Sequence, residues 1–103
     1  MPPKLDIDRE RIAAFCRKWK IPELALFGSV LRDDFGPESD VDVLVTLAED
    51  AHYGLRELFA MEQELSEVFG REVDFVTRRS VEASENWIRR RIVLDSAELL
   101  YVA

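Results

Sequence analysis

The sequence has few of the features that mark membrane, secreted or nucleic-acid-binding proteins. No apolar run approaches the ~20 residues that span a bilayer, and the N-terminal segment contains no apolar signal region. The single cysteine, Cys16, excludes an internal disulfide. Acidic residues outnumber lysine and arginine by 21 to 14, and the resulting net charge of −7 argues against a broad basic face for nucleic acid. We therefore expect a cytoplasmic protein that has no membrane anchor and does not bind nucleic acid directly.

The remaining composition is typical of a globular protein. Hydrophobic residues make up 48% of the 103 positions, so we expect a single domain over residues 1–103 with one modest core. Apolar spacing and breaker residues predict helix 8–18, strand 24–27, short helix 30–34, strand 40–47, helix 53–69, strand 72–77, helix 85–95 and, over residues 99–102, a short final strand or a docking tail. This order indicates an α/β or α+β fold, in which helices pack on a small mixed sheet.

Two aspartates interrupt the apolar strand predicted over residues 40–47. Because side chains alternate along a strand, Asp40 and Asp42 share one face, while Val41 and Val43 belong to a continuous apolar face. The two carboxylates lie ~6.6 Å apart along the strand and repel each other by roughly 2.5 kcal/mol at an effective dielectric constant of 20. A divalent cation reverses the sign of this energy, and Mg²⁺ binds one or two carboxylates together with water and phosphate. The pattern favours a metal site over its alternative, a solvated acidic strand start.

The Gly28-Ser29 dipeptide ends the preceding strand and leads into the short helix. A strand that turns into a helix leaves backbone N–H groups pointing outward, which makes an anion site. Gly28 has no side chain to block a close approach, and the hydroxyl of Ser29 adds a donor. We expect this turn to hold phosphate opposite the aspartate pair.

A third carboxylate, Asp74, lies in the strand predicted over residues 72–77. Alternation places Asp74 on the face opposite Val73 and Phe75. If this strand pairs beside strand 40–47, Asp74 lies next to Asp42. Three carboxylates can hold two cations in the arrangement used for phosphoryl transfer.

Three other features of the sequence have simpler interpretations. The cluster Arg89-Arg90-Arg91 is interpreted as solvated or ion-paired surface, with partner docking or RNA contact as the alternative. Trp87 and Ile88 are expected to pack on the core. The lone histidine, His52, is expected at the surface near a helix start and not as a catalytic base.

The motif formed by Gly28-Ser29, ten intervening residues and Asp40-Val41-Asp42 resembles the pattern of the nucleotidyltransferase superfamily that includes the polymerase β catalytic core. This resemblance implies a polymerase β-like fold with ATP as substrate and two Mg²⁺ ions as cofactors. It implies that Asp40, Asp42 and Asp74 bind the metal and catalyse the reaction, and that Gly28 and Ser29 contact the phosphates.

The resemblance also implies a phosphate contact for Arg32, although that arginine could instead pair with neighbouring acids. The sequence departs from the usual pattern here, because Asp33 and Asp34 follow Arg32 where small residues are common. Two additional negative charges weaken triphosphate binding unless they point to solvent.

The short chain looks like a minimal nucleotidyltransferase, the antitoxin partner of HEPN ribonuclease toxins. That branch implies transfer of AMP from ATP to a tyrosine of the toxin, in a hetero-oligomeric complex. About a hundred residues leave little room for an acceptor domain, so we expect the acceptor on another macromolecule. The alternatives are a non-catalytic nucleotide-binding antitoxin that masks its toxin, and an enzyme that modifies a small hydroxylated substrate.

Overall fold

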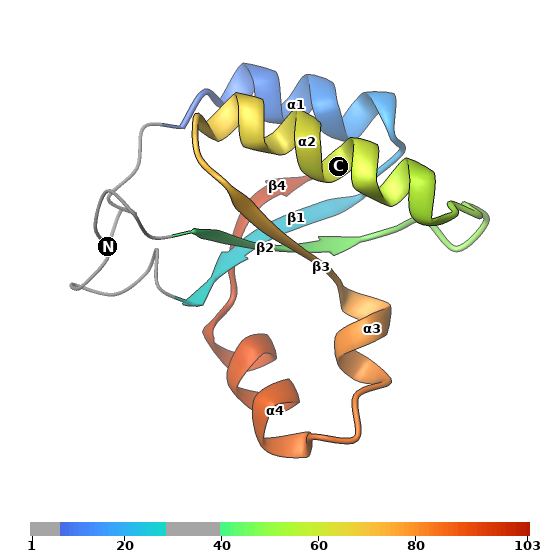
Figure 1. Ribbon diagram of the computed structural model, residues 1–103, viewed down its shortest axis with the longest axis vertical. Coiled ribbons are helices and arrows are strands. Elements are labelled where there is room, and N and C mark those ends of the chain that lie inside the picture. The colour runs from blue at the N-terminus through green and yellow to red at the C-terminus, as the bar shows by residue number, and fades with distance from the viewer. Residues whose placement is uncertain (1–6, 29–39) are drawn as a thin grey trace.

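The computed structural model describes residues 7–28 and 40–103 and shows a four-stranded sheet with helices on both faces (Figure 1). The elements are α1 (Arg9–Lys18), β1 (Glu23–Phe27), β2 (Val41–Thr46), α2 (Leu55–Phe69), β3 (Val73–Thr77), α3 (Arg78–Glu82), α4 (Trp87–Ser96) and β4 (Glu98–Val102). The strand order is β3-β2-β1-β4; β2 and β3 are parallel, and the other pairs are antiparallel. The small mixed sheet predicted from the sequence is confirmed.

Helices α1 and α2 end where their sequence signals indicate, and α2 begins at Leu55, two positions later than predicted. Asp8 caps α1 by accepting a hydrogen bond from the backbone N–H of Arg11 at 3.2 Å. Gly70, in the left-handed conformation at φ 67°, ends α2 as a glycine is expected to do. Within the described residues, no helix combines the length and the apolar character that crossing a bilayer requires.

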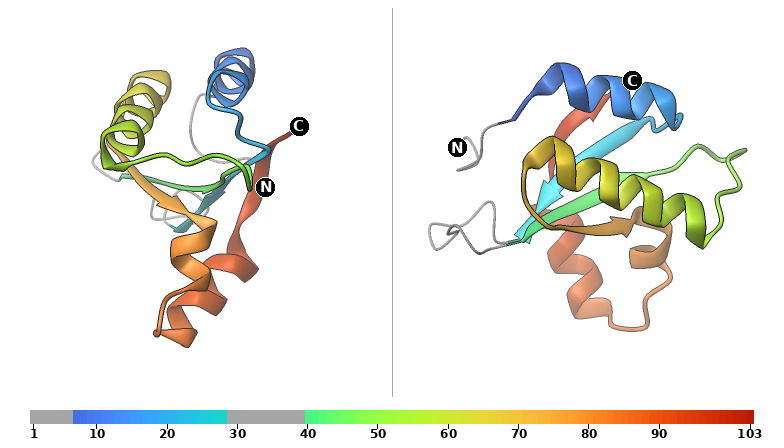
Figure 2. Two further views of the ribbon diagram at one scale, coloured as in Figure 1. Left: turned by 90° about the vertical axis from the view of Figure 1, so that its right-hand side faces the viewer. Right: turned by 45° about the horizontal axis from the view of Figure 1, so that its top comes forward.

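The sheet has two unequal apolar faces, each covered by its own pair of helices (Figure 2). On one face, α1 and α2 contribute Ile12, Phe15, Met61 and Leu65 to the larger cluster. On the other face, α3 and α4 contribute only Val81 and Val93 to the smaller cluster, which also contains Ala25, Phe27 and Leu44 of the sheet.

Strand β2 connects the two clusters because its side chains alternate between the faces. Val41, Val43 and Val45 are fully buried in the larger cluster, and Leu44 is buried in the smaller one. The continuous valine face predicted for this strand is confirmed. Asp42 precedes Leu44 by two positions and therefore shares its face.

The second half of the chain differs from the prediction in two helices. Helix α3 was not predicted, because a five-residue turn of helix has no apolar period of its own; Thr77 caps it through the N–H of Ser80. Helix α4 begins at Trp87 with Asn86 as its cap, two positions later than predicted. The short helix expected over residues 30–34 lies outside the described residues.

The expected packing of Trp87 and Ile88 on the core is wrong. Their side chains are 60% and 54% exposed. An apolar pair at a helix start fits a core or a protein interface equally well, so the sequence pattern does not separate these environments.

Burial of Cys16 generates a prediction about its reactivity. The thiol is 1% exposed, and desolvation raises its pKa from 9.0 to about 12, against a smaller lowering by Arg17. Because the thiolate is the reactive species, we expect a thiol reagent to label native protein far more slowly than urea-unfolded protein from pH 7 to 10. Equal labelling rates in the two states, measured by absorbance, would contradict this burial.

Candidate active site

The central pair of the site consists of Asp42 and Asp74. The parallel pairing of β2 with β3 places these two residues directly opposite each other, with Val43 opposite Phe75 at the next position. Neighbouring strands lie about 4.8 Å apart, so the two aspartates are adjacent on one face of the sheet. The placement of Asp74 beside Asp42 is confirmed, and the role of the pair as metal ligands remains a prediction.

Gly28 lies directly against the carboxylate of Asp42. It follows β1, in which Phe27 pairs with Asp42, and adopts a positive φ of 73°. A Cβ atom at this position would lie 3.1 Å from Cγ of Asp42 and would overlap the carboxylate. The turn therefore favours glycine, which tolerates the left-handed backbone and leaves room for the aspartate.

Asp40 completes the predicted acidic set at the entrance to β2. It is exposed and directly precedes the strand, where the N–H of Val41 donates to the carbonyl of Glu72 at 3.0 Å. Two further predicted phosphate-site residues, Ser29 and Arg32, and the acidic neighbours Asp33 and Asp34 lie outside the described residues.

The donor set fits a hard cation that is shared with a phosphate. Across residues 7–28 and 40–103, no three histidine, cysteine, aspartate or glutamate residues form a ready-made metal cluster. Mg²⁺ does not need such a cluster, because it binds through one or two carboxylates and keeps water and substrate phosphate as its other ligands. Adjacent Asp42 and Asp74 provide this kind of carboxylate pair.

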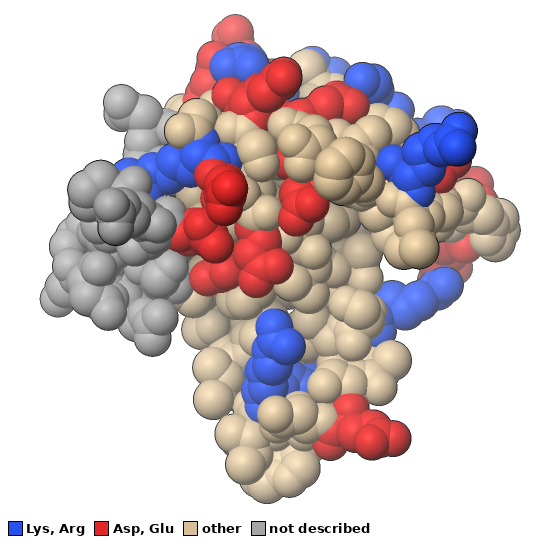
Figure 3. All heavy atoms as spheres, viewed as in Figure 1, with Lys and Arg blue, Asp and Glu red and all other residues tan. Residues whose placement is uncertain are grey.

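The carboxylates share a face of the sheet with α3 and α4. Because residues two apart in a strand share a face, Asp42 lies on the same face as Leu44, and Asp74 on the same face as Val76. Leu44 is buried in the smaller cluster, and Val76 packs against it. Figure 3 shows acidic side chains gathered over the part of the surface where Figure 1 places β3. A concentration of negative charge on one face favours the approach of cations.

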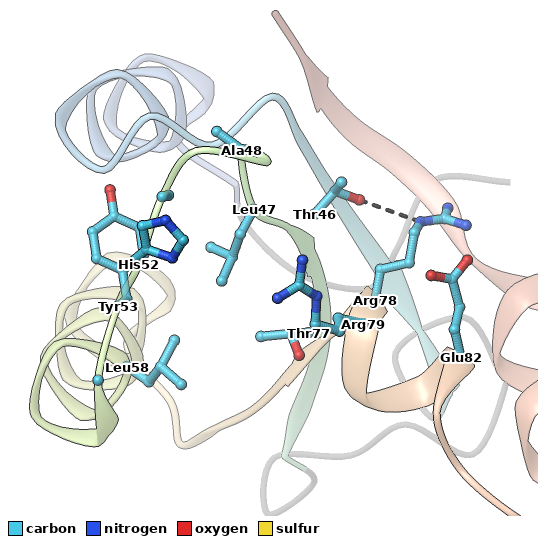
Figure 4. Close-up of a pocket in the computed structure, with 12 residues that line it drawn as sticks. Thr46, Leu47, Ala48, His52, Tyr53, Leu58, Thr77, Arg78, Arg79 and Glu82 are labelled. Atoms are coloured by element: carbon cyan, nitrogen blue, oxygen red, sulfur yellow. Dashed lines mark hydrogen bonds between the residues drawn. The ribbon is translucent and has the colours of Figure 1, made fainter.

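A separate pocket of about 600 Å³ lies at the opposite ends of β2 and β3 (Figure 4). Thr46, Thr77, Arg78, Arg79 and His52 are among its lining residues, and Nε of Arg78 donates to Oγ1 of Thr46 at 3.3 Å. Thr46 lies about 13 Å along the strand from Asp42, so this pocket is not part of the carboxylate site. The sequence did not indicate it, because its walls come from separate segments: the ends of β2 and β3, the loop after β2, α2 and α3.

Comparisons with known proteins agree with this geometry. Residues 9–100 match the nucleotidyltransferase domain family. A protein of Methanocaldococcus jannaschii named "Putative protein adenylyltransferase" is 32% identical over 97 residues, which cover 94% of this chain and 92% of the relative.

Solved structures with the same fold come from toxin–antitoxin systems. A crystal structure of a toxin–antitoxin with AMP-PNP superposes with a TM-score of 0.72 at 22% identity, covering 94% of this chain and 75% of that chain. A structure of tri-AMPylated Shewanella oneidensis HEPN toxin in complex with MNT antitoxin gives 0.63 at 23% identity, covering 92% and 70%.

These similarities confirm the resemblance found in the motif. At such low identity the solved structures show the fold, which is that of the minimal nucleotidyltransferases. The family match adds the evidence from sequence, since it extends over nearly the whole chain. The protein belongs to the nucleotidyltransferase domain family.

Proposed function

We propose that this protein is an adenylyltransferase that acts as an antitoxin, transferring AMP from ATP to a tyrosine of a cognate HEPN toxin with Mg²⁺ as cofactor. The observation that carries the proposal is the adjacent pair of Asp42 and Asp74 beside Gly28. Family membership supports nucleotidyl transfer. The name of the archaeal relative and the AMPylated toxin in one structural neighbour support a protein acceptor.

The residues of the site have separate tasks in this reaction. Asp40, Asp42 and Asp74 would hold two Mg²⁺ ions, which supply charge neutralisation at the phosphates and activation of the attacking hydroxyl. Asp74 also accepts the proton of the tyrosine hydroxyl. Gly28 leaves room for the carboxylate of Asp42, and Ser29 and Arg32 would contact the triphosphate oxygens.

The bond changes follow from in-line attack at phosphorus. The tyrosine oxygen bonds to the α-phosphorus of ATP, the bond from that phosphorus to the bridging oxygen breaks, and pyrophosphate leaves. Catalysis then depends on positioning and on charge stabilisation, both of which require the carboxylate face of β2.

Removal of one negative charge from the pair tests the catalytic role. We expect Asp42→Asn and Asp74→Asn each to lower AMP transfer to the toxin by about 100-fold or more, because each removes a charge that the reaction needs. Intact-mass spectrometry of the toxin measures transfer as an added AMP. Asp50→Asn is the matched control, since Asp50 is exposed in the turn after β2, away from the site.

The same variants separate transfer from masking. A folded Asp42→Asn protein that modifies the toxin at the wild-type rate would refute the proposed chemistry. Full toxin suppression by the Asp40→Asn, Asp42→Asn double variant would instead support a non-catalytic antitoxin.

A pair of glycine substitutions tests the contact between the turn and the carboxylate. Gly28 and Gly70 both have positive φ, so alanine strains the backbone at each by about 1–3 kcal/mol. Only at Gly28 does the added Cβ meet Asp42, whereas nothing lies within 4 Å at Gly70. We expect Gly28→Ala to abolish AMP transfer and Gly70→Ala to destabilise the fold while leaving transfer intact.

Urea unfolding gives the free-energy change for each glycine variant, and the mass assay gives the transfer rate. Equal transfer by the two variants would show that the close approach of Gly28 to Asp42 has no part in activity.

A further inference from the structure

Helix α4 exposes an apolar surface that the rest of the described chain does not cover. Trp87, Ile88 and Ile92 are 60%, 54% and 62% exposed, whereas Val93 is the one buried residue of this helix. An isolated helix of ten residues is marginal in water, and among the described residues α4 packs on the sheet through buried Val93 and partly buried Leu94 alone. A second surface packed against it would supply further apolar contact.

The arginines of α4 divide into a structural residue and two surface residues. Arg90 holds the turn between α3 and α4, since its Nη1 donates to the carbonyls of Glu82 and Ser84 at 3.3 and 3.1 Å. Arg89 is exposed, and Arg91 makes only an exposed pair with Asp95 at 3.5 Å. We call Trp87, Ile88, Ile92, Arg89 and Arg91 the α4 surface. Figure 3 shows basic side chains over the lower part of the molecule, where Figure 1 places α4.

The α4 surface lies on the same side of the sheet as the carboxylates. Val93 belongs to the cluster that contains Phe27 and Leu44, and Asp42 pairs with Phe27 across the strands. After α4, the chain enters β4, where Glu98 pairs with Leu26 near the end of β1. The α4 surface therefore belongs to the layer of helices on the carboxylate side of the sheet.

We propose that the α4 surface is the docking site for the acceptor protein, which presents an apolar contact region with an acidic rim. The inference rests on the proposed function and assigns the binding site of the acceptor protein to the α4 surface. The acidic rim follows from charge complementarity with Arg89 and Arg91 on a chain whose net charge is −7.

Two other occupants are less compatible with these charges. A second copy related by two-fold symmetry would bring its own Arg89 and Arg91 into the same contact, which places like charges together. RNA would approach a chain of net charge −7 that has few basic residues beside the patch.

A charge placed in the apolar patch tests the docking site, with an equally exposed residue as control. Ile92→Glu puts a carboxylate into the α4 surface, and Phe59→Glu makes the same kind of change on α2, where Phe59 is also 62% exposed. Calorimetric titration of each variant with the separately purified cognate HEPN toxin, in the absence of ATP, measures Kd. We expect Ile92→Glu to weaken binding at least about tenfold and Phe59→Glu to leave it unchanged.

Charge reversal at the rim gives a second measurement. Arg89→Glu with Arg91→Glu is expected to weaken binding more at low salt than at high salt, because the contribution of exposed charges is screened. Circular dichroism checks that α4 remains helical in every variant, and Ile88→Ala serves as a milder change if Ile92→Glu unfolds it.

The outcomes distinguish docking from chemistry. The docking site is overturned if Ile92→Glu binds like wild type, if Phe59→Glu loses as much affinity, or if Ile92→Glu only disrupts self-association in sedimentation. It is also overturned if the arginine variants lose binding to a labelled RNA but keep binding to the toxin. A wild-type protein that binds the toxin through Ile92 but transfers no AMP refutes the proposed chemistry and leaves the docking site standing.

Discussion

The pairing of β2 with β3 is the constraint on which the rest of the site depends. Val41, Val43 and Val45 are fully buried, so a slip of one position would move three valines to the opposite face. Hydrophobic burial therefore fixes the register that brings Asp42 opposite Asp74. The buried valines on either side of Asp42 therefore determine where its carboxylate lies.

This register has an electrostatic cost that the fold must support. Two carboxylates about 4.8 Å apart repel each other by roughly 3.5 kcal/mol at an effective dielectric constant of 20. A bound divalent cation would convert that repulsion into attraction, as the proposed magnesium site requires. Interactions that lower stability are common at functional sites, and the repulsion between these carboxylates is an interaction of this kind.

Sequence reasoning succeeded where a local period determines the structure. The alternation in β2, the apolar stripe of α1 and the glycine that ends α2 each specify one conformation. It failed at α3, which is too short to show an apolar period. It also failed at Trp87, because an apolar side chain does not indicate whether the protein core or another protein covers it. The contact of Gly28 with Asp42 depends on pairing between β1 and β2. The motif spacing therefore suggests that the two segments meet, but the contact itself is seen only in the fold.

The connection between α4 and β4 has a thermodynamic consequence. Ala97 alone separates the two elements, and β4 pairs with β1, which ends at the Gly28 turn. Under the proposed function, a partner bound to α4 would contact an element that one residue joins to β4, the strand paired with the one that leads into the Gly28 turn. Coupling of this kind is reciprocal: whatever factor the partner adds to nucleotide affinity, the nucleotide adds to partner affinity. Under the proposed function, the protein would bind its toxin with different affinity in the nucleotide-bound and nucleotide-free states.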